Sequence, residues 1–83
     1  MAGTEESPSE QRQLEFRKAL GARVRELRRQ RGINQDDFAY RAGIHRTHVG
    51  MLENGKIDPK ISTVLRVADA LGLEFWELVR LDK

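Results

Sequence analysis

Apolar side chains recur at helical spacing along most of the chain, and glycines separate the periodic segments. The spacing predicts helices at about 9–31, 35–42, 45–53, 60–71 and 74–81, with no strand pattern and no internal repeat. We therefore expect one all-α domain, a compact bundle of about five helices. The apolar positions expected to face its core are Phe16, Leu20, Val24, Leu27, Phe38, Ala42, Ile44, Val49, Leu52, Ile61, Val64, Leu65, Ala68, Leu71, Phe75 and Leu78.

Small and polar residues mark where these helices meet and end. Asn34 is expected to be the N-cap of the second helix, and Gly43 ends it in the left-handed conformation that glycine adopts cheaply. Ala39 and Gly43 are expected to let the second and third helices pack closely. Gly21 and Gly50 lie inside predicted helices, where each costs about 1 kcal/mol of helix propensity relative to alanine.

The N-terminal residues 1–8 are polar and acidic, and we expect them to form a disordered tail. The first helix begins either after Ser9 as N-cap or with Pro8 at the first helical position, behind Ser7. The chain lacks cysteine, which excludes disulfides and thiolate zinc sites. It shows neither the pattern of a signal peptide nor an apolar run near the ~20 residues of a membrane span.

Basic residues are concentrated in one part of the chain. The formal net charge is only +2, yet residues 12–31 carry eight basic and two acidic side chains. All but one of the eight basic residues are arginine. Such clustering suits either a surface that binds a polyanion or a solvated helix face, and charge alone does not separate the two.

The segment 35–54, QDDFAYRAGIHRTHVGMLEN, describes two short helices hinged at one glycine. The second of these helices would bury Val49 and Leu52 while turning polar side chains outward. This pattern is typical of a helix-turn-helix with an exposed recognition helix. The outward residues would be Arg46, Thr47, His48 and Met51.

The region from about Leu20 to Val79 resembles the lambda-repressor-like (Cro/repressor, Xre-type) helix-turn-helix family. The resemblance rests on RVRELRRQRGINQDDFAYRAGIHRTHVGMLENGK followed by DPKISTVLRVADALGLEFWEL. It implies a DNA-binding domain over 9–83, with the helix-turn-helix at 35–54 and the third helix in the major groove. Stand-alone phage repressors and restriction–modification controller proteins are similar in size and layout.

The resemblance implies base contacts by Arg46, Thr47 and Met51. Arginine can donate two hydrogen bonds to guanine, and threonine can bond a base or place its methyl on thymine. Methionine offers only apolar contact, most naturally to a thymine methyl. For Thr47 and His48 the alternative is a phosphate contact or plain solvation.

Contacts to the DNA backbone are expected on both sides of the recognition helix. The family uses a glutamine at the position of Gln35, where free backbone N–H groups at a helix N-terminus also favour an anion. His45 replaces the usual serine or threonine cap, so we expect it to cap poorly and to face a phosphate instead. The full set of expected backbone contacts is Gln35, His45, His48, Asn54, Lys56 and Arg25, with Arg29 as a further possibility and solubilising charge as the alternative.

Two further sets of residues are expected to support the fold and the assembly. The resemblance implies a partly buried ion pair between Arg28 and Glu53, which ties the recognition helix to the first helix. Trp76 stands where the family usually has a polar residue, so we expect a dimer interface formed by Trp76, Val79 and Leu81. The alternative is that Trp76 folds back over the first helix near Phe16 or Leu14.

These features favour a transcription regulator that binds a palindromic operator as a homodimer in the cytoplasm, associated with the nucleoid. The alternative is a protein-interaction module, such as a HigA-type antitoxin. Expected partners are double-stranded DNA, a second copy of the chain, and a protein such as a toxin or RNA polymerase, but no membrane. No catalytic residues, cofactor or metal site are expected: His45 and His48 lack a third ligand nearby.

Overall fold

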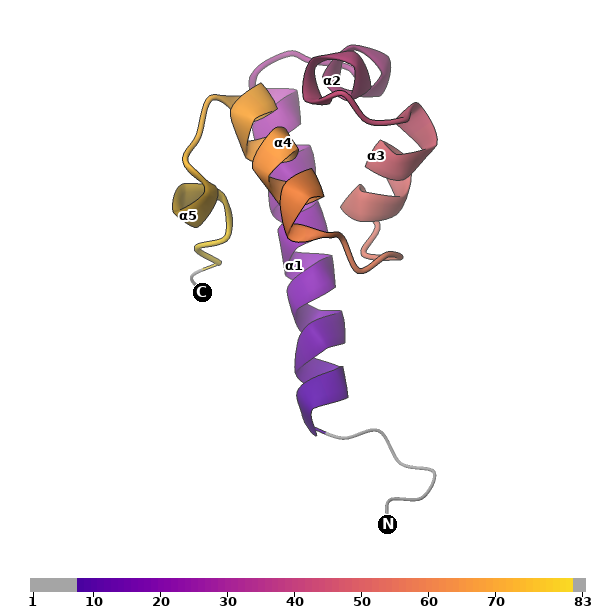
Figure 1. Cartoon of the computed structure of the whole chain (residues 1–83), viewed down its shortest axis with the longest axis vertical. Helices are drawn as coiled ribbons and strands as arrows, with labels where there is room; N and C mark the ends of the chain where they lie inside the picture. The colour runs from indigo at the N-terminus through magenta and orange to yellow at the C-terminus, as the bar shows by residue number, and fades with distance from the viewer. Residues whose placement is uncertain (1–7, 82–83) are drawn as a thin grey trace.

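The computed structural model describes residues 8–81 and contains five helices, which confirms the predicted all-α fold (Figure 1). They are α1 (Pro8–Gln30), α2 (Gln35–Ala42), α3 (Arg46–Glu53), α4 (Ile61–Leu71) and α5 (Phe75–Leu78). The last helix is shorter than its sequence pattern predicted. Across residues 8–81, no helix combines the length and apolar character needed to cross a membrane.

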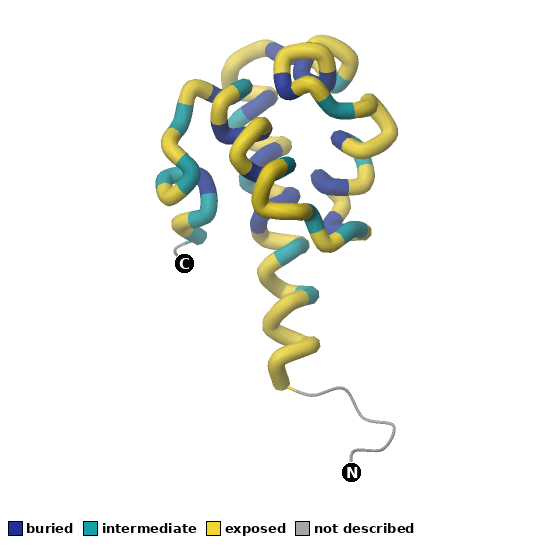
Figure 2. Tube along the Cα trace, in the orientation of Figure 1, coloured by how far each residue is buried: buried dark blue, intermediate teal, exposed yellow. Residues whose placement is uncertain are grey.

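Helix α1 spans 23 residues and runs the length of the molecule (Figure 1). It begins at Pro8. Of the two predicted starts, the one with proline at the first helical position is therefore confirmed. The other residues of the predicted tail, 1–7, lie outside the described part of the chain. The first buried residue of α1 is Leu20, and Phe16 is 43% exposed (Figure 2). The predicted burial of Phe16 is therefore wrong, because no other helix covers this part of α1.

Every helix contributes to a single core. The recognition segment is fastened to it by Phe38 of α2 and Val49 of α3, which are both fully buried. Two predicted core positions on α4 are wrong: Ile61 and Leu65 are exposed. Ile61 is the first residue of α4, one turn before its first buried residue, and Leu65 lies beside the buried stripe rather than in it. The largest fully buried side chains are Phe38, Leu20, Leu78, Val24, Val49 and Val67.

The turn between α2 and α3 is formed by backbone conformation rather than by tight packing. Gly43 has φ of 70°, and the N–H of Ile44 donates to the Ala39 carbonyl at 3.0 Å. A Cβ at Gly43 would meet only the Arg66 guanidinium, at 3.8 Å. Gly43 is therefore needed for its left-handed backbone. The expectation that it permits close helix packing is wrong, whereas Ala39 is buried as expected for a residue at the helix crossing.

Arg23 of α1 and Arg31, the residue after α1, hold the C-terminal ends of two other helices. The Arg23 guanidinium donates to the carbonyls of Leu78 and Glu77, both at 2.9 Å, and fixes α5 against α1. Arg31 donates to the Leu71 carbonyl at 3.1 Å, at the end of α4. These carbonyls have no partner within their own helices, so the arginines satisfy groups that the helix ends leave open.

At Gly21 the backbone of α1 lies close to the backbone of α3. A Cβ built on Gly21 would lie 2.3 Å from the Leu52 carbonyl oxygen and 2.6 Å from that of Glu53. Both neighbours are backbone atoms, so they cannot move aside as a flexible side chain could. Any side chain at this position would push the recognition helix away from α1.

We predict that Gly21→Ala lowers the free energy of unfolding by about 1–3 kcal/mol, despite the better helix propensity of alanine. Gly50→Ala is the matched control: it also lies inside a helix, but a Cβ there meets nothing within 4 Å. The control should raise the free energy of unfolding by up to about 1 kcal/mol. Urea unfolding followed by circular dichroism measures both, and a Gly21→Ala protein as stable as wild type would refute the close approach.

Candidate nucleic-acid interface

Helix α3 has one buried and one exposed face. Val49, Leu52 and Glu53 are buried against the rest of the bundle. Among residues 8–81 nothing covers the opposite face, and Gly50 lies at its edge with open space where a Cβ would be. An exposed face on a firmly anchored helix is the geometry that fits a DNA major groove. The exposed residues are Arg46, Thr47, His48 and Met51.

His45 is the N-cap of α3, contrary to the expectation that it would cap poorly. Its Nδ1 accepts a hydrogen bond from the Thr47 backbone N–H at 3.1 Å. A ring nitrogen that accepts must be unprotonated, so Nε2 carries the proton and can donate. The side chain is exposed, and its free donor can therefore meet a phosphate without giving up the cap.

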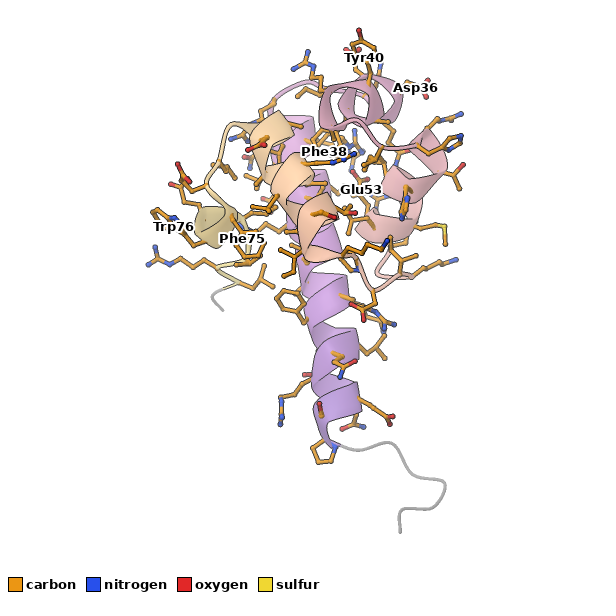
Figure 3. All side chains as sticks on the ribbon, in the orientation of Figure 1. Asp36, Phe38, Tyr40, Glu53, Phe75 and Trp76 are labelled. Atoms are coloured by element: carbon orange, nitrogen blue, oxygen red, sulfur yellow. The ribbon has the colours of Figure 1, made fainter. Side chains whose placement is uncertain are left out.

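Arg46, the first residue of α3, is held by an acid on α2. Its Nε lies 2.9 Å from Oδ1 of Asp36, and the two side chains are 68% and 73% exposed. Figure 3 shows Asp36 on the outside of α2. An ion pair this exposed is worth at most about 1 kcal/mol, whereas a two-bond contact to guanine is worth about 1–3 kcal/mol. Asp36 therefore orders Arg46 without preventing it from contacting a base through Nη1 and Nη2.

The buried carboxylate of Glu53 joins α3 to both preceding helices (Figure 3). Arg28 donates to it through Nε at 2.6 Å and Nη2 at 3.0 Å. Its Nη1 donates to the Ile33 carbonyl at 2.7 Å. The hydrogen bonds from Arg28 to Glu53 raise the pKa of Arg28 above its usual value, although burial alone would lower it. Arg28 therefore stays charged, and its role lies in the scaffold, because it is only 8% exposed.

Glu53 also gathers two of the predicted backbone contacts. Gln35 donates its side-chain amide to Glu53 Oε1 at 3.1 Å, and Arg25 Nε lies 3.7 Å from the same oxygen. Gln35 is the first residue of α2, where free backbone N–H groups can bind an anion. Arg25 and Arg29 both line a hollow of about 490 Å³ beside Glu53. The structure thus brings residues from three helices together along one edge of α3.

The other predicted backbone contacts lie at the C-terminal end of α3. Asn54 donates its side-chain amide to the Gly50 carbonyl at 2.9 Å and so closes the end of the helix. One amide hydrogen of Asn54 remains for another acceptor. Lys56 is exposed just beyond it. Predicted phosphate contacts therefore flank the exposed face of α3 at both ends.

Two residues that shape this surface were missed in the sequence. Asp36 pairs with Arg46, and nothing in the local spacing of the two residues indicates this contact. Arg66 on α4 donates to the Gly43 carbonyl at 3.1 Å and holds the turn of the helix-turn-helix. A contact between residues 23 positions apart has no local sequence signal.

Trp76 on α5 is 63% exposed and points away from α1 (Figure 3). The alternative in which it folds back over Phe16 or Leu14 is therefore wrong. Val79 and Leu81 are half-buried beside it in sequence. Within residues 8–81, no group of three or more histidines, cysteines or acids is arranged to hold a metal ion.

Comparison with known proteins identifies the family. A helix-turn-helix family model, HTH_3, matches residues 24–78. This chain belongs to that helix-turn-helix family. An uncharacterized HTH-type transcriptional regulator of Sinorhizobium fredii, y4dJ, is 33% identical over 66 residues, which are 80% of this chain and 86% of the relative.

Two other helix-turn-helix proteins extend the comparison. The immunity repressor protein of Bacillus phage phi105 is 30% identical to this chain. The match covers 72% of this chain and 42% of the repressor. The crystal structure of the restriction–modification controller protein C.AhdI from Aeromonas hydrophila matches with a TM-score of 0.72 and 36% identity, over 74% of this chain and 92% of that one. As a member of this family, the protein is a DNA-binding transcription regulator and not an enzyme. These relatives give no support to the toxin-binding alternative.

We predict that Arg28→Met lowers the free energy of unfolding by about 3–5 kcal/mol, because it leaves the Glu53 carboxylate buried without its main partner. The double variant Arg28→Met/Glu53→Met should lose less than Arg28→Met alone, since no charge then remains buried. Chemical unfolding of the variants measures the coupling. Arg28→Lys, which keeps a charge but has no planar fork, gives an intermediate loss and serves where Arg28→Met does not fold. If the loss of the double variant equals the sum of the losses of Arg28→Met and Glu53→Met, the coupling between the two side chains is refuted.

Proposed function

We propose that this protein is a sequence-specific transcription regulator that binds a palindromic operator as a homodimer. The observation that carries the proposal is the exposed face of α3 on a helix whose opposite face is locked into the core by Val49, Leu52 and Glu53. A helix held in this way can enter the major groove without losing conformational freedom on binding.

Base recognition is assigned to Arg46, Thr47 and Met51, which lie on the exposed face. Arg46 supplies the polar discrimination through a two-bond contact with guanine, so each half-site contains at least one G·C pair. Met51 supplies apolar contact one turn further along. This support comes from exposure and chemistry: the groups are free to reach a base edge, and the strongest of them is already ordered by Asp36.

Phosphate binding is assigned to groups on both sides of that face. Arg25 and Gln35 lie together at Glu53, and the free Nε2–H of His45 lies at the start of α3. Lys56 lies past its end, with Asn54 beside it. Contacts to the backbone on either side of the recognition helix fix its register in the groove, while the sequence is recognised in between.

Dimerisation follows from the small size of the recognition surface. One α3 helix of eight residues contacts too few base pairs for a selective site. A two-fold dimer doubles the site and places half-sites about one helical turn, ~34 Å, apart. The exposed Trp76, together with Val79 and Leu81, supplies apolar surface for this contact. Protein concentration then controls occupancy through the dimerisation equilibrium.

We predict that Arg46→Ala removes the guanine preference at one position of each half-site, at a cost of about 1–3 kcal/mol on the preferred sequence. Lys56→Ala is the matched control, because it should weaken binding equally on all sequences and reduce the salt slope by about one. Selection of bound sequences from a random DNA pool, followed by salt titration, measures both effects. An unchanged preferred sequence for Arg46→Ala would exclude it from direct base recognition.

We predict that Trp76→Ala weakens the dimer about tenfold or more, because it removes an exposed aromatic side chain from the interface. Tyr40→Ala is the control: Tyr40 is even more exposed, but it lies on α2, away from α5 (Figure 3). Sedimentation equilibrium gives the dimer constant of each variant. Equal constants for Trp76→Ala and wild type would exclude Trp76 from the interface.

A further inference from the structure

The N-terminal half of α1 projects beyond the bundle with no other helix packed on it (Figure 2). None of residues 8–19 is buried, although this segment makes up about half of a 23-residue helix. At 1.5 Å per residue it extends about 18 Å. An isolated helix of this length is marginally stable in water, and Phe16, its largest apolar side chain, is 43% exposed.

The apolar side chains of this segment form part of a hollow with the segment that follows α5. Phe16, Ala19 and Leu81 line a depression of about 370 Å³, and Arg12 and Glu15 lie at its edge. Phe16 also lines a second hollow, of about 270 Å³, on its other side. Phe16 is therefore a raised apolar side chain with open space on both flanks.

We propose that this surface, the α1 docking face (Arg12, Glu15, Phe16, Ala19 and Leu81), binds the same surface of a second copy of the chain. The inference rests on the homodimer proposed above, and it adds a part of the interface that lies outside the family match at residues 24–78. In a two-fold contact, the Phe16 ring of each protomer fills the hollow beside the partner's Phe16.

The area that a stable dimer needs supports this assignment. Stable interfaces bury about 800 Å² on each partner, contributed by about 20–30 residues. Helix α5 has only four residues, so Trp76 and its neighbours cannot supply that area alone. The α1 docking face is continuous with the α5 surface through Leu81, and it adds about three helical turns. In Figure 1, α5 and α3 lie on opposite sides of α1, so a partner bound there leaves the recognition helix free.

Charge on the α1 docking face is complementary to itself. Arg12 and Glu15 are both exposed, and neither forms an ion pair among residues 8–81. When two α1 helices run antiparallel with the two-fold axis between Gln13 and Leu14, Arg12 of each protomer lies opposite Glu15 of the partner subunit. Each Phe16 ring then lies beside the partner's ring, over the hollow that Arg12, Gln13 and Phe16 line. Opposite charges at the edge of an apolar contact fix its register, whereas like charges oppose it.

Charge reversal tests this arrangement by sedimentation equilibrium of the full chain. Arg12→Glu and Glu15→Arg each create two like-charge contacts across the axis, so each should weaken the dimer at least several-fold at low salt. The double variant Arg12→Glu/Glu15→Arg restores opposite charges with the wild-type net charge, and it should regain the wild-type dimer constant. Phe16→Ala should weaken the dimer about tenfold, whereas Tyr40→Ala should not change it. Circular dichroism verifies that each variant is folded, as expected because all the changed side chains are exposed.

The outcomes separate this inference from the proposed function. If Trp76→Ala weakens the dimer while the Phe16 and charge variants do not, the homodimer stands and the α1 docking face is refuted. If the wild-type protein remains monomeric on its selected operator, the proposed dimer itself fails. If Arg12→Glu weakens DNA binding at an unchanged dimer constant, the segment contacts the DNA backbone and the docking face is likewise refuted. A double variant no better than its parents would exclude the pairing of Arg12 with Glu15 of the partner subunit.

Discussion

The position of the recognition helix depends on one buried carboxylate. Glu53 ends α3, is only 4% exposed, and receives hydrogen bonds from α1 and α2. A buried charge without partners costs several kcal/mol, so the fold is stable only when Arg28 and Glu53 meet. Because Arg28 also binds the Ile33 carbonyl, the loop before α2 is fixed by the same group. The close approach of Gly21 to the end of α3 completes this constraint, since it excludes any side chain at position 21.

The basic residues between positions 12 and 31 fall into two sets with different roles. Arg23, Arg28 and Arg31 bind carbonyls and a carboxylate inside the molecule. Arg25 and Arg29 face a solvent-open hollow beside α3. The net charge of this segment therefore overstates the charge available to DNA. Neither a polyanion-binding surface nor a solvated helix face describes the whole cluster. A long helix turns successive arginines toward different neighbours.

Periodicity predicted the helices well because it depends on local geometry. The helix-turn-helix, the caps at Asn34 and Gly43, and the buried face of α3 all follow from spacing and backbone preference. The errors at Phe16, Ile61 and Leu65 have a common cause. An apolar stripe shows which side of a helix faces a neighbour, but not how far along the helix that neighbour extends. The capping role of His45 was missed for a different reason, since its ring nitrogen accepts only in one protonation state and one rotamer.

The sequence by itself determined the all-α class, the helix-turn-helix at its place in the chain, and the residues on the exposed side of α3. These depend on contacts between residues a few positions apart, for which helical spacing and capping chemistry are sufficient. Only the tertiary structure decided that Asp36 orders Arg46, that Gln35 and Arg25 meet at Glu53, and that no residue in the N-terminal half of α1, 8–19, is buried. Each of these depends on how the helices are placed relative to one another, which the packing of the core and the buried ion pair determine. The spacing of residues within one helix does not predict contacts between residues of different helices.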